Sequence, residues 1–244
     1  MRVPPEQRLL GRLPSAKDPR TLYFLQYVDP KAAEPPDKRL WQLPISDWGI
    51  MGNNQHGNCV IVTAAHAILA WRANELTDTR RITDSAVIEL SRQMGALRGY
   101  NILARLKYWR KNGMWSNKLW AFAGIDPTDR LATRIAINSC GALDIGVNLP
   151  NAWRSADVWV DGTGRDYSPG SWGGHSVPLV GYDVNYVYAV SWGDIIPMTW
   201  PAMARYCDEA YALINPDWLA ADSVAPSGLN LQLLHEHLQA ITER

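Results

Sequence analysis

The chain contains 244 residues, of which 24 are basic and 24 acidic, so its formal net charge is zero. Hydrophobic residues make up 47% and charged residues 20%, as in ordinary globular proteins. Its apolar runs are far shorter than the ~20 residues of a membrane span, so a membrane protein is not expected. It has no block of Lys and Arg residues for phosphate contacts, so a nucleic-acid binder is not expected either.

The cysteine content favours a reducing compartment. Cys59, Cys140 and Cys207 cannot all pair within the chain, and three cysteines are too few for a disulfide scaffold. The N-terminus also lacks the apolar stretch of a secretory signal. We therefore expect a cytoplasmic protein, of a bacterium or of a phage-infected cell, with virion association as an option.

Residues 1–46 are predicted to form an arm that precedes a domain at residues 47–244. The arm holds half of the chain's 16 prolines. Because proline lacks an N–H group and has a fixed φ angle, we expect the arm to be extended and to wrap around the domain rather than build part of it.

The first half of the domain is predicted to be helical. A loop rich in Gly and Asn at residues 48–58 leads into an apolar segment that begins at Cys59. This segment is typical of a buried helix, for which Asn58 is the expected N-cap. Further helices are predicted at residues 83–94, 102–111 and 129–139.

The second half is predicted to be rich in strands. Strands are expected at residues 143–149, 177–182, 186–191 and 210–214. A short helix near residues 201–206, capped by Thr199, interrupts them, and an amphipathic helix at 229–242 closes the chain. Helices followed by strands predict the α+β class.

Cys59 is the candidate nucleophile. It lies where a glycine-containing loop meets the start of a helix, and the positive end of a helix dipole favours the thiolate form. The side-chain amide of Asn53 or Gln55, with the backbone N–H of Cys59, would form an oxyanion hole. A buried, unreactive core cysteine is the alternative.

His175 is the candidate acid/base. It follows Ser171-Trp-Gly-Gly174 and opens a predicted strand, where it could take a proton from the thiol and give it to a leaving group. A surface-loop histidine is the alternative. We assign His66 to the core, and we expect no metal site, since no cluster of ligands joins His235 and His237.

These segments together resemble the papain-like cysteine peptidases. The loop Asn53–Cys59 resembles the nucleophile motif, Gly174–Tyr182 the strand that carries the catalytic histidine, and Tyr188–Gly193 the strand ending in Asn-Ser-Trp-Gly. The resemblance covers roughly residues 48–214. It implies a two-lobed α+β fold, with Cys59 in a helical lobe and His175 in an antiparallel β lobe.

The segment after Ser191-Trp-Gly, with Met198-Thr-Trp200, resembles divergent papain-like proteins of bacteriophages and mobile elements. The resemblance implies a peptidase that hydrolyses peptide or isopeptide bonds in peptide or protein substrates, without metal or cofactor. Phage structural proteins are candidate partners. Peptidoglycan peptidases with a Cys–His pair fit less well, because their cysteine and histidine are close in sequence.

Two positions depart from the family pattern. Asn53 stands in the place of the oxyanion glutamine and is one methylene shorter, so Gln55 is a second candidate. Val190 stands in the place of the asparagine that orients the histidine, and valine cannot donate or accept a hydrogen bond. The remaining candidates for orienting His175 are Asp183, Asn185 and Ser191; otherwise a plain Cys–His dyad must act alone.

Three tryptophans flank the candidate site. Trp48, Trp172 and Trp192 are predicted to build the cleft wall. The valine at position 190 also supports an alternative from another class, a catalytically inactive papain-like scaffold such as a phage virion or assembly component.

Overall fold

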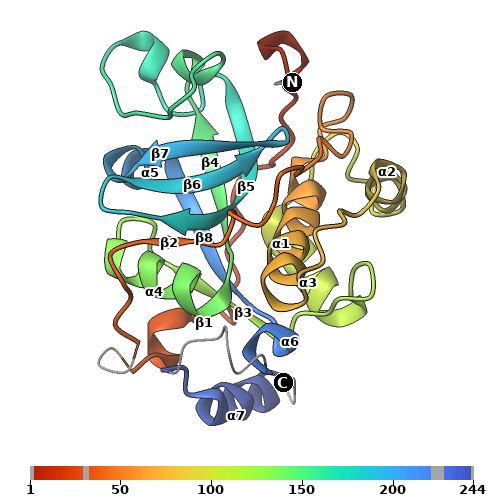
Figure 1. Ribbon diagram of the computed structural model, residues 1–244, viewed down its shortest axis with the longest axis vertical. Coiled ribbons are helices and arrows are strands. Elements are labelled where there is room, and N and C mark those ends of the chain that lie inside the picture. Colours follow the sequence, from red (N-terminus) through yellow and green to blue (C-terminus); the bar gives the residue numbers. More distant parts are fainter. Residues whose placement is uncertain (1–2, 30–32, 221–227, 243–244) are drawn as a thin grey trace.

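The computed structural model describes residues 3–29, 33–220 and 228–242. Three helices form one lobe, on the right of Figure 1. They are α1 (Cys59–Glu75), α2 (Asp84–Gln93) and α3 (Ile102–Asn112). α1 is buried on nearly all sides, as its apolar sequence requires.

Side-chain caps set the helix boundaries. The Thr83 hydroxyl accepts a hydrogen bond from the third residue of α2, and the Asn101 side chain does the same for α3. α4 (Arg130–Cys140) begins after the capping carboxylate of Asp129 and ends at Gly141, whose φ of 73° is left-handed.

A mixed sheet forms the second lobe. Within the described residues it has eight strands in the order β1-β3-β8-β4-β5-β6-β7, with β2 paired to β5 beside this path. β1 and β3 are parallel, and the other pairs are antiparallel. The strands are β1 (Leu22–Tyr23), β2 (Arg39–Leu40), β3 (Ala121–Ile125), β4 (Leu143–Leu149), β5 (Gly173–Tyr182), β6 (Tyr186–Ser191), β7 (Asp194–Thr199) and β8 (Cys207–Ile214).

The register at the centre of the sheet brings the functional segments together. β4 pairs with β5 so that Val147 lies opposite His175. On its other edge β4 pairs with β8, so that Gly146 lies opposite Glu209. β5 packs against α1 of the other lobe, and this contact joins the two lobes beside Cys59.

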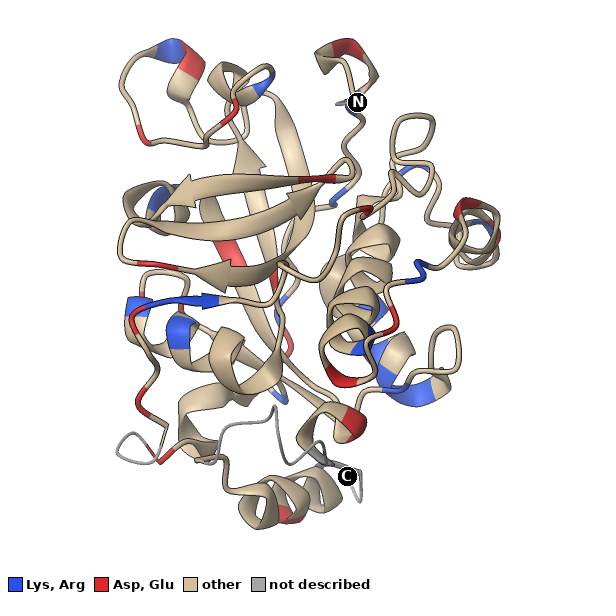
Figure 2. Cartoon of the chain, in the orientation of Figure 1, with Lys and Arg blue, Asp and Glu red and all other residues tan. Residues whose placement is uncertain are grey.

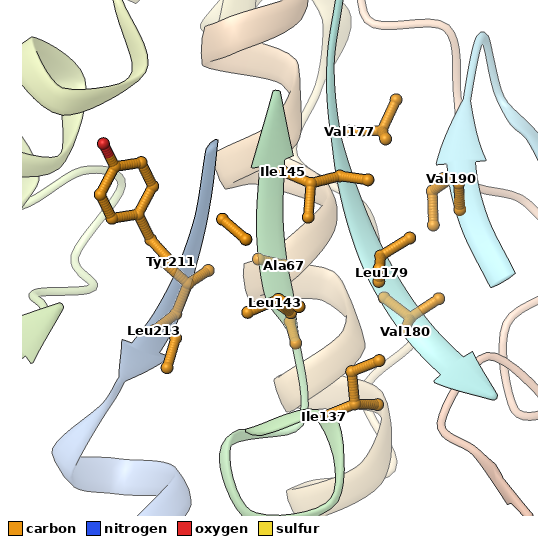
Figure 3. Packing of buried hydrophobic residues seen from close by; sticks show 14 of the residues in the cluster. Ala67, Ile137, Leu143, Ile145, Val177, Leu179, Val180, Val190, Tyr211 and Leu213 are labelled. Atoms are coloured by element: carbon orange, nitrogen blue, oxygen red, sulfur yellow. The ribbon is translucent and has the colours of Figure 1, made fainter. Parts of the chain in front are cut away.

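The core lies between the sheet and the helices on its faces. Figure 3 shows Ala67 of α1 and Ile137 of α4 among the apolar side chains of β4, β5 and β8. The remaining helices of the described structure are the 3-10 turns Pro5–Gln7, Phe24–Tyr27, Asn151–Trp153 and Arg165–Tyr167, and the helices α5 (Trp200–Tyr206), α6 (Pro216–Ala220) and α7 (Leu231–Thr242). No helix in the described part of the chain has the length and apolarity needed to cross a membrane.

The predicted α+β fold with a helical lobe and a β lobe is confirmed, but several local expectations are wrong. The arm does build part of the domain: its Phe24 and Tyr27 are buried in the core, and β1 and β2 extend the sheet. Pro30, one of the arm prolines, lies outside the described residues. Cys207, expected in a helix, begins β8 instead.

The expected cap of α1 is also wrong. Asn58 occupies the N-cap position, but its side chain does not bond to the helix. Its amide instead donates to the carbonyl of Met51 and to the Ser91 hydroxyl, and these bonds hold the loop that precedes Cys59. The strands β3 and β7 were not expected from the sequence.

Candidate active site

Cys59 is the first residue of α1, and its thiol is buried at the interface between the two lobes. The backbone N–H of Ser176, the residue after His175 on β5, points at the sulfur, and so does the backbone N–H of Gly11 in the arm. Burial raises the pKa of the Cys59 thiol to about 11, and these two N–H groups, together with that of Val60, offset this only in part. In this conformation Cys59 is a protonated thiol at neutral pH.

His175 is buried on β5 with one ring nitrogen bonded and the other free. Nε2 lies 2.8 Å from the Ser191 hydroxyl, whereas Nδ1 is buried with no hydrogen-bond partner. Burial, followed by the nearby positive charge of Arg12, lowers the pKa of His175 to about 3. The imidazole is therefore neutral at physiological pH and retains a free nitrogen that can accept or donate a proton.

Alternation along β6 explains why Ser191, and not Val190, reaches His175. Successive side chains of a strand point to opposite faces. Val190 is buried in the apolar core, and Figure 3 shows it on β6, the neighbour of β5. The next side chain therefore faces the imidazole.

The other two candidates for orienting His175 lie elsewhere. Asp183 and Asn185 belong to the turn after β5, at the opposite end of this strand from His175. The Asp183 carboxylate accepts hydrogen bonds from the backbone N–H of Asn185 and from the hydroxyl of Tyr188. The structure thus places both residues in a hairpin turn, away from the imidazole.

Trp192 covers His175 because the β6–β7 turn is tight. Trp192 and Gly193 both have positive φ angles, 47° and 82°, as the two central residues of a two-residue hairpin turn require. The indole stacks on the imidazole with ring centroids 4.5 Å apart, and Trp172 stacks on Trp192 at 5.5 Å. Trp48 lies apart from this stack and packs edge-on against His66 of α1.

The two oxyanion candidates differ in position. Asn53 is buried, and its amide donates to the carbonyls of Leu9, at 3.3 Å, and His56, at 3.1 Å. Gln55 is exposed. Asn53 is therefore the amide that already donates to a backbone carbonyl beside the site. Trp192 donates its indole N–H to the same Leu9 carbonyl, at 3.2 Å.

The arm occupies the site, and sequence reasoning missed this feature. Tyr100 of the helical lobe donates to the Gly11 carbonyl at 2.8 Å and accepts from the Leu13 N–H at 3.0 Å. Arg12 donates its backbone N–H to Gly174 of the β lobe at 3.1 Å. The arm therefore bridges the two lobes across Cys59.

Glycines make this passage possible. A Cβ added to Gly11 would lie 1.7 Å from the carbonyl oxygen of Gly57, and a Cβ on Gly174 would lie 2.5 Å from the Arg12 carbonyl. Only residues without side chains allow the backbones to approach so closely. A glycine at position 11 within a proline-rich arm is the one signal in the sequence that could have indicated a close backbone approach.

A buried polar network lies beneath the site. Thr63 of α1 bonds to the Cys59 carbonyl and to the Ser176 hydroxyl, both at 3.0 Å. Ser176 donates to Asp144 of β4 at 3.3 Å, and Asp144 forms an ion pair with Arg105 of α3 that is fully buried on both sides. The network therefore links both lobes directly behind the Cys59–His175 pair.

The remaining histidines and cysteines lie outside the site. His66 donates its Nε2–H to the carbonyls of Trp48 and Gly49, and burial lowers its pKa to about 4. Cys140 and Cys207 are buried, unpaired thiols whose pKa values burial raises. In the described part of the chain no three His, Cys, Asp or Glu residues gather in a way that could hold a metal ion.

Solved cysteine proteases share this architecture. Xylellain, a cysteine protease from Xylella fastidiosa, has a TM-score of 0.66 at 13% identity, covering 85% of this chain and 96% of its own. ProCathepsin B S9 from Trypanosoma congolense has a TM-score of 0.63 at 10% identity, covering 86% and 87%. The Carica candamarcensis cysteine protease CMS1MS2, in complex with E-64, has a TM-score of 0.54 at 15% identity, covering 73% and 98%.

No family model and no curated protein matches the sequence, so the likeness lies in the three-dimensional structure. The structural neighbours and the position of Cys59 at the start of α1, with His175 on the antiparallel sheet, show that the chain has the α+β papain-like fold.

Proposed function

We propose that the chain is a cysteine peptidase that hydrolyses peptide or isopeptide bonds, with Cys59 as nucleophile and His175 as general acid/base. One observation carries the proposal. The Cys59 thiol lies against the backbone of β5 one residue beyond His175, whose Nδ1 is buried and has no partner. A helix-terminal thiol and a histidine with a free ring nitrogen are the two groups that nucleophilic catalysis uses, and the contact of the thiol with the residue after His175 brings them to the same place in the fold.

The reaction proceeds through an acyl-enzyme. His175 Nδ1 takes the thiol proton, and the Cys59 sulfur attacks the carbonyl carbon of the substrate. The imidazolium then gives its proton to the leaving amine, which leaves a thioester on Cys59. His175 next takes a proton from a water molecule, and the resulting hydroxide attacks the thioester. The products are the carboxylic acid and the regenerated thiol.

Neighbouring groups have supporting roles in this proposal. The Asn53 amide and the Cys59 backbone N–H stabilise the oxyanion, in keeping with the bond that Asn53 already donates to a carbonyl oxygen. Ser191 orients the imidazole through Nε2, and Trp192 stacks on the ring and excludes water from that bond. Ser191 thus takes the role that Val190 cannot fill.

The arm keeps this enzyme latent. A thiolate attacks a carbonyl carbon, but the arm presents to Cys59 the N–H group of Gly11, so the arm is not positioned as a substrate. The arm also buries Cys59 and His175. With pKa values of about 11 and about 3, the two residues are a neutral thiol and a neutral imidazole. Displacement of the arm would admit water and substrate, and would return both pKa values toward their ordinary range.

The alternative is a scaffold with no catalytic activity, for which burial of both residues is the supporting observation. An origin in a phage or mobile element is supported by sequence resemblance alone, in the loop before Cys59, in Ser191-Trp-Gly followed by Met198-Thr-Trp200, and in Asp208–Ala212. The two functions predict different results once the arm is displaced, while a folded, closed chain is inactive under both.

Gly11→Ala in the full chain is the test, because the added methyl group would overlap the Gly57 backbone. If the chain is a peptidase, the Gly11→Ala protein hydrolyses a mixture of unstructured fluorogenic peptides. This activity disappears when Cys59→Ser or His175→Ala is added. A folded Gly11→Ala protein that shows no turnover with any peptide in the mixture would refute the peptidase and favour the scaffold.

A further inference from the structure

The arm carries one side chain, Arg12, into a buried acidic pocket beside the candidate site. The guanidinium, whose side chain is only 1% exposed, contacts side chains of the neighbouring strands β4 and β8. Its Nη1 is 2.8 Å from Glu209 Oε1 and 2.9 Å from Asp208 Oδ1, and its Nη2 is 2.6 Å from Asn148 Oδ1. Three acceptor side chains therefore surround one arginine head group.

The walls of the pocket come from the domain and not from the arm. Glu209 is held by the hydroxyl of Tyr211, which donates to Oε2 at 3.1 Å. Gly146 forms the wall, and a Cβ there would lie 2.9 Å from Arg12 Nη1. A side chain at position 146 would overlap both Glu209 and the guanidinium, so glycine is needed there for the two groups to meet.

The pocket is also adjacent to the reacting groups. Gly146 is paired with Ser176, and Val147 with His175, so the pocket is one strand away from the imidazole. The backbone N–H of Arg12 donates to the Gly174 carbonyl, and the N–H of the preceding residue, Gly11, points at the Cys59 thiol. The Arg12 side chain thus enters the pocket from a backbone that passes directly over the site. Any peptide bound along the same path would present a side chain to this pocket.

The charge of the pocket shows which side chain it suits. Two carboxylates, Asp208 and Glu209, face a single cation, and Figure 2 shows an acidic section on β8 within the sheet. Without the arm, both carboxylates would have no cation in the pocket. The buried Glu209, only 3% exposed, would then be left without its ionic partner, which is unfavourable.

The geometry favours arginine over lysine. Asp208 accepts from both terminal nitrogens of Arg12, at 2.9 and 3.3 Å, as a planar fork allows, while Glu209 and Asn148 take one nitrogen each. A lysine ammonium is a single point charge and cannot bridge acceptors that are arranged around a plane.

We propose that this pocket is a substrate subsite that selects an arginine side chain, and that Arg12 occupies it as the chain's own ligand. The inference rests on the proposed peptidase function. It names Glu209 as the residue that determines specificity, with Asp208 and Asn148 in support and Gly146 providing the space. The substrates are then peptides or proteins with an arginine close to the cleaved bond.

The test uses the full-length chain with Arg12→Ala, which empties the pocket and weakens the hold of the arm. Peptidyl epoxide probes carry arginine, lysine or norleucine at one position and are otherwise identical. A separate set is made for each position along the probe, and the rate of Cys59 modification is measured for every probe. At one position the arginine probe should react about 100-fold faster than the norleucine probe. Lysine should fall between them.

Glu209→Gln, added to Arg12→Ala, should reduce the arginine preference to about tenfold or less, because the amide keeps the shape and loses the charge. Asp208→Asn is the matched control and should have a smaller effect, since this carboxylate is 37% exposed. Labelling of Cys59 without arginine preference at any probe position would overturn the subsite and leave the peptidase intact.

A second measurement does not depend on reaction at Cys59. N-acetyl-arginine methylamide should raise the melting temperature of the Arg12→Ala protein, N-acetyl-norleucine methylamide should not, and Glu209→Gln should abolish the difference. If no probe labels Cys59 even when Gly11→Ala is added to displace the arm, the proposed function fails, and this measurement alone decides whether the pocket binds arginine. If Arg12→Ala does not fold, both measurements are made on Gly11→Ala, in which the overlap with the Gly57 backbone displaces the arm and withdraws Arg12 from the pocket.

Discussion

Substituting Gly11 by alanine should expose the Cys59 thiol. The Gly11 backbone approaches Gly57 so closely that an added Cβ would lie 1.7 Å from a carbonyl oxygen and 2.4 Å from its carbon. Both atoms belong to the backbone, so no rotation of a side chain can relieve the overlap. The arm must therefore leave its place between Tyr100 and Gly174.

The expected magnitude follows from the pKa of the thiol. Burial raises the pKa of Cys59 from its ordinary 9.0 to about 11. A return to the ordinary value would increase the thiolate fraction at pH 7 about 100-fold, and alkylation depends on the thiolate. Improved access of the reagent would add to this factor, so an increase of at least about 100-fold in the alkylation rate is predicted.

Alkylation by iodoacetamide at pH 7, followed by peptide mass analysis, measures the rate at each cysteine separately. Cys140 is the internal control, because it is buried at the end of α4, where its carbonyl accepts from Trp71, whereas Cys207 adjoins the Asp208–Glu209 pair that binds Arg12. Leu13→Ala is the matched arm control, since this side chain is half exposed and can be shortened without overlap. Cys59 in a folded Gly11→Ala protein that reacts no faster than in the parent would refute the argument that the arm buries it. Equal acceleration at all three cysteines would instead indicate unfolding.

Three further outcomes are predicted. Ser191→Ala should lower kcat/KM of the opened Gly11→Ala enzyme about tenfold with little change in unfolding free energy, because it removes the bond to His175 Nε2; unchanged kinetics would refute the orienting role. Asp144→Asn should lower the urea-measured unfolding free energy by about 3–5 kcal/mol, because it leaves Arg105 as a buried charge without its ionic partner, and a loss below about 1 kcal/mol would contradict this. His66 and His175 have pKa values of about 4 and about 3 in the folded chain, below the ordinary 6.5, so the unfolded state binds more protons as pH falls below about 6.5. The unfolding free energy should therefore fall by about 2 kcal/mol for each histidine between pH 6.5 and 5, and His66→Gln should remove its share; a flat profile would contradict the burial of both rings.

Much of the fold follows from local patterns. The strand at 143–149 alternates in sequence and matches β4, and the strand at 186–191 matches β6. The strand β7 escaped the prediction because Pro197 argues against a central strand. β7 is the last strand of the path, and an edge strand tolerates a residue that has no N–H group.

The contacts of the site were harder to predict because they depend on packing between distant segments. Alignment with the family motif puts Val190 in the place of the residue that orients His175. In the structure the strand presents Ser191 to the ring, and Val190 is buried in the core. The arm contact depends on a match between Gly11 and Gly57, which lie in different segments and show no shared sequence pattern. Such contacts become visible only when the chain has folded.

The central claim is that Cys59 and His175 act together on a carbonyl group, and a trapped acyl-enzyme tests it most directly. The full-length Gly11→Ala chain is mixed with an activated peptide ester, the reaction is quenched within one turnover, and the cysteine-containing peptides are weighed by mass spectrometry. The account predicts an acyl group on Cys59 and none on Cys140 or Cys207, with acylation at least about 100-fold slower when His175→Ala is added. An opened, folded protein that forms no adduct, or forms it equally fast without His175, would contradict the account.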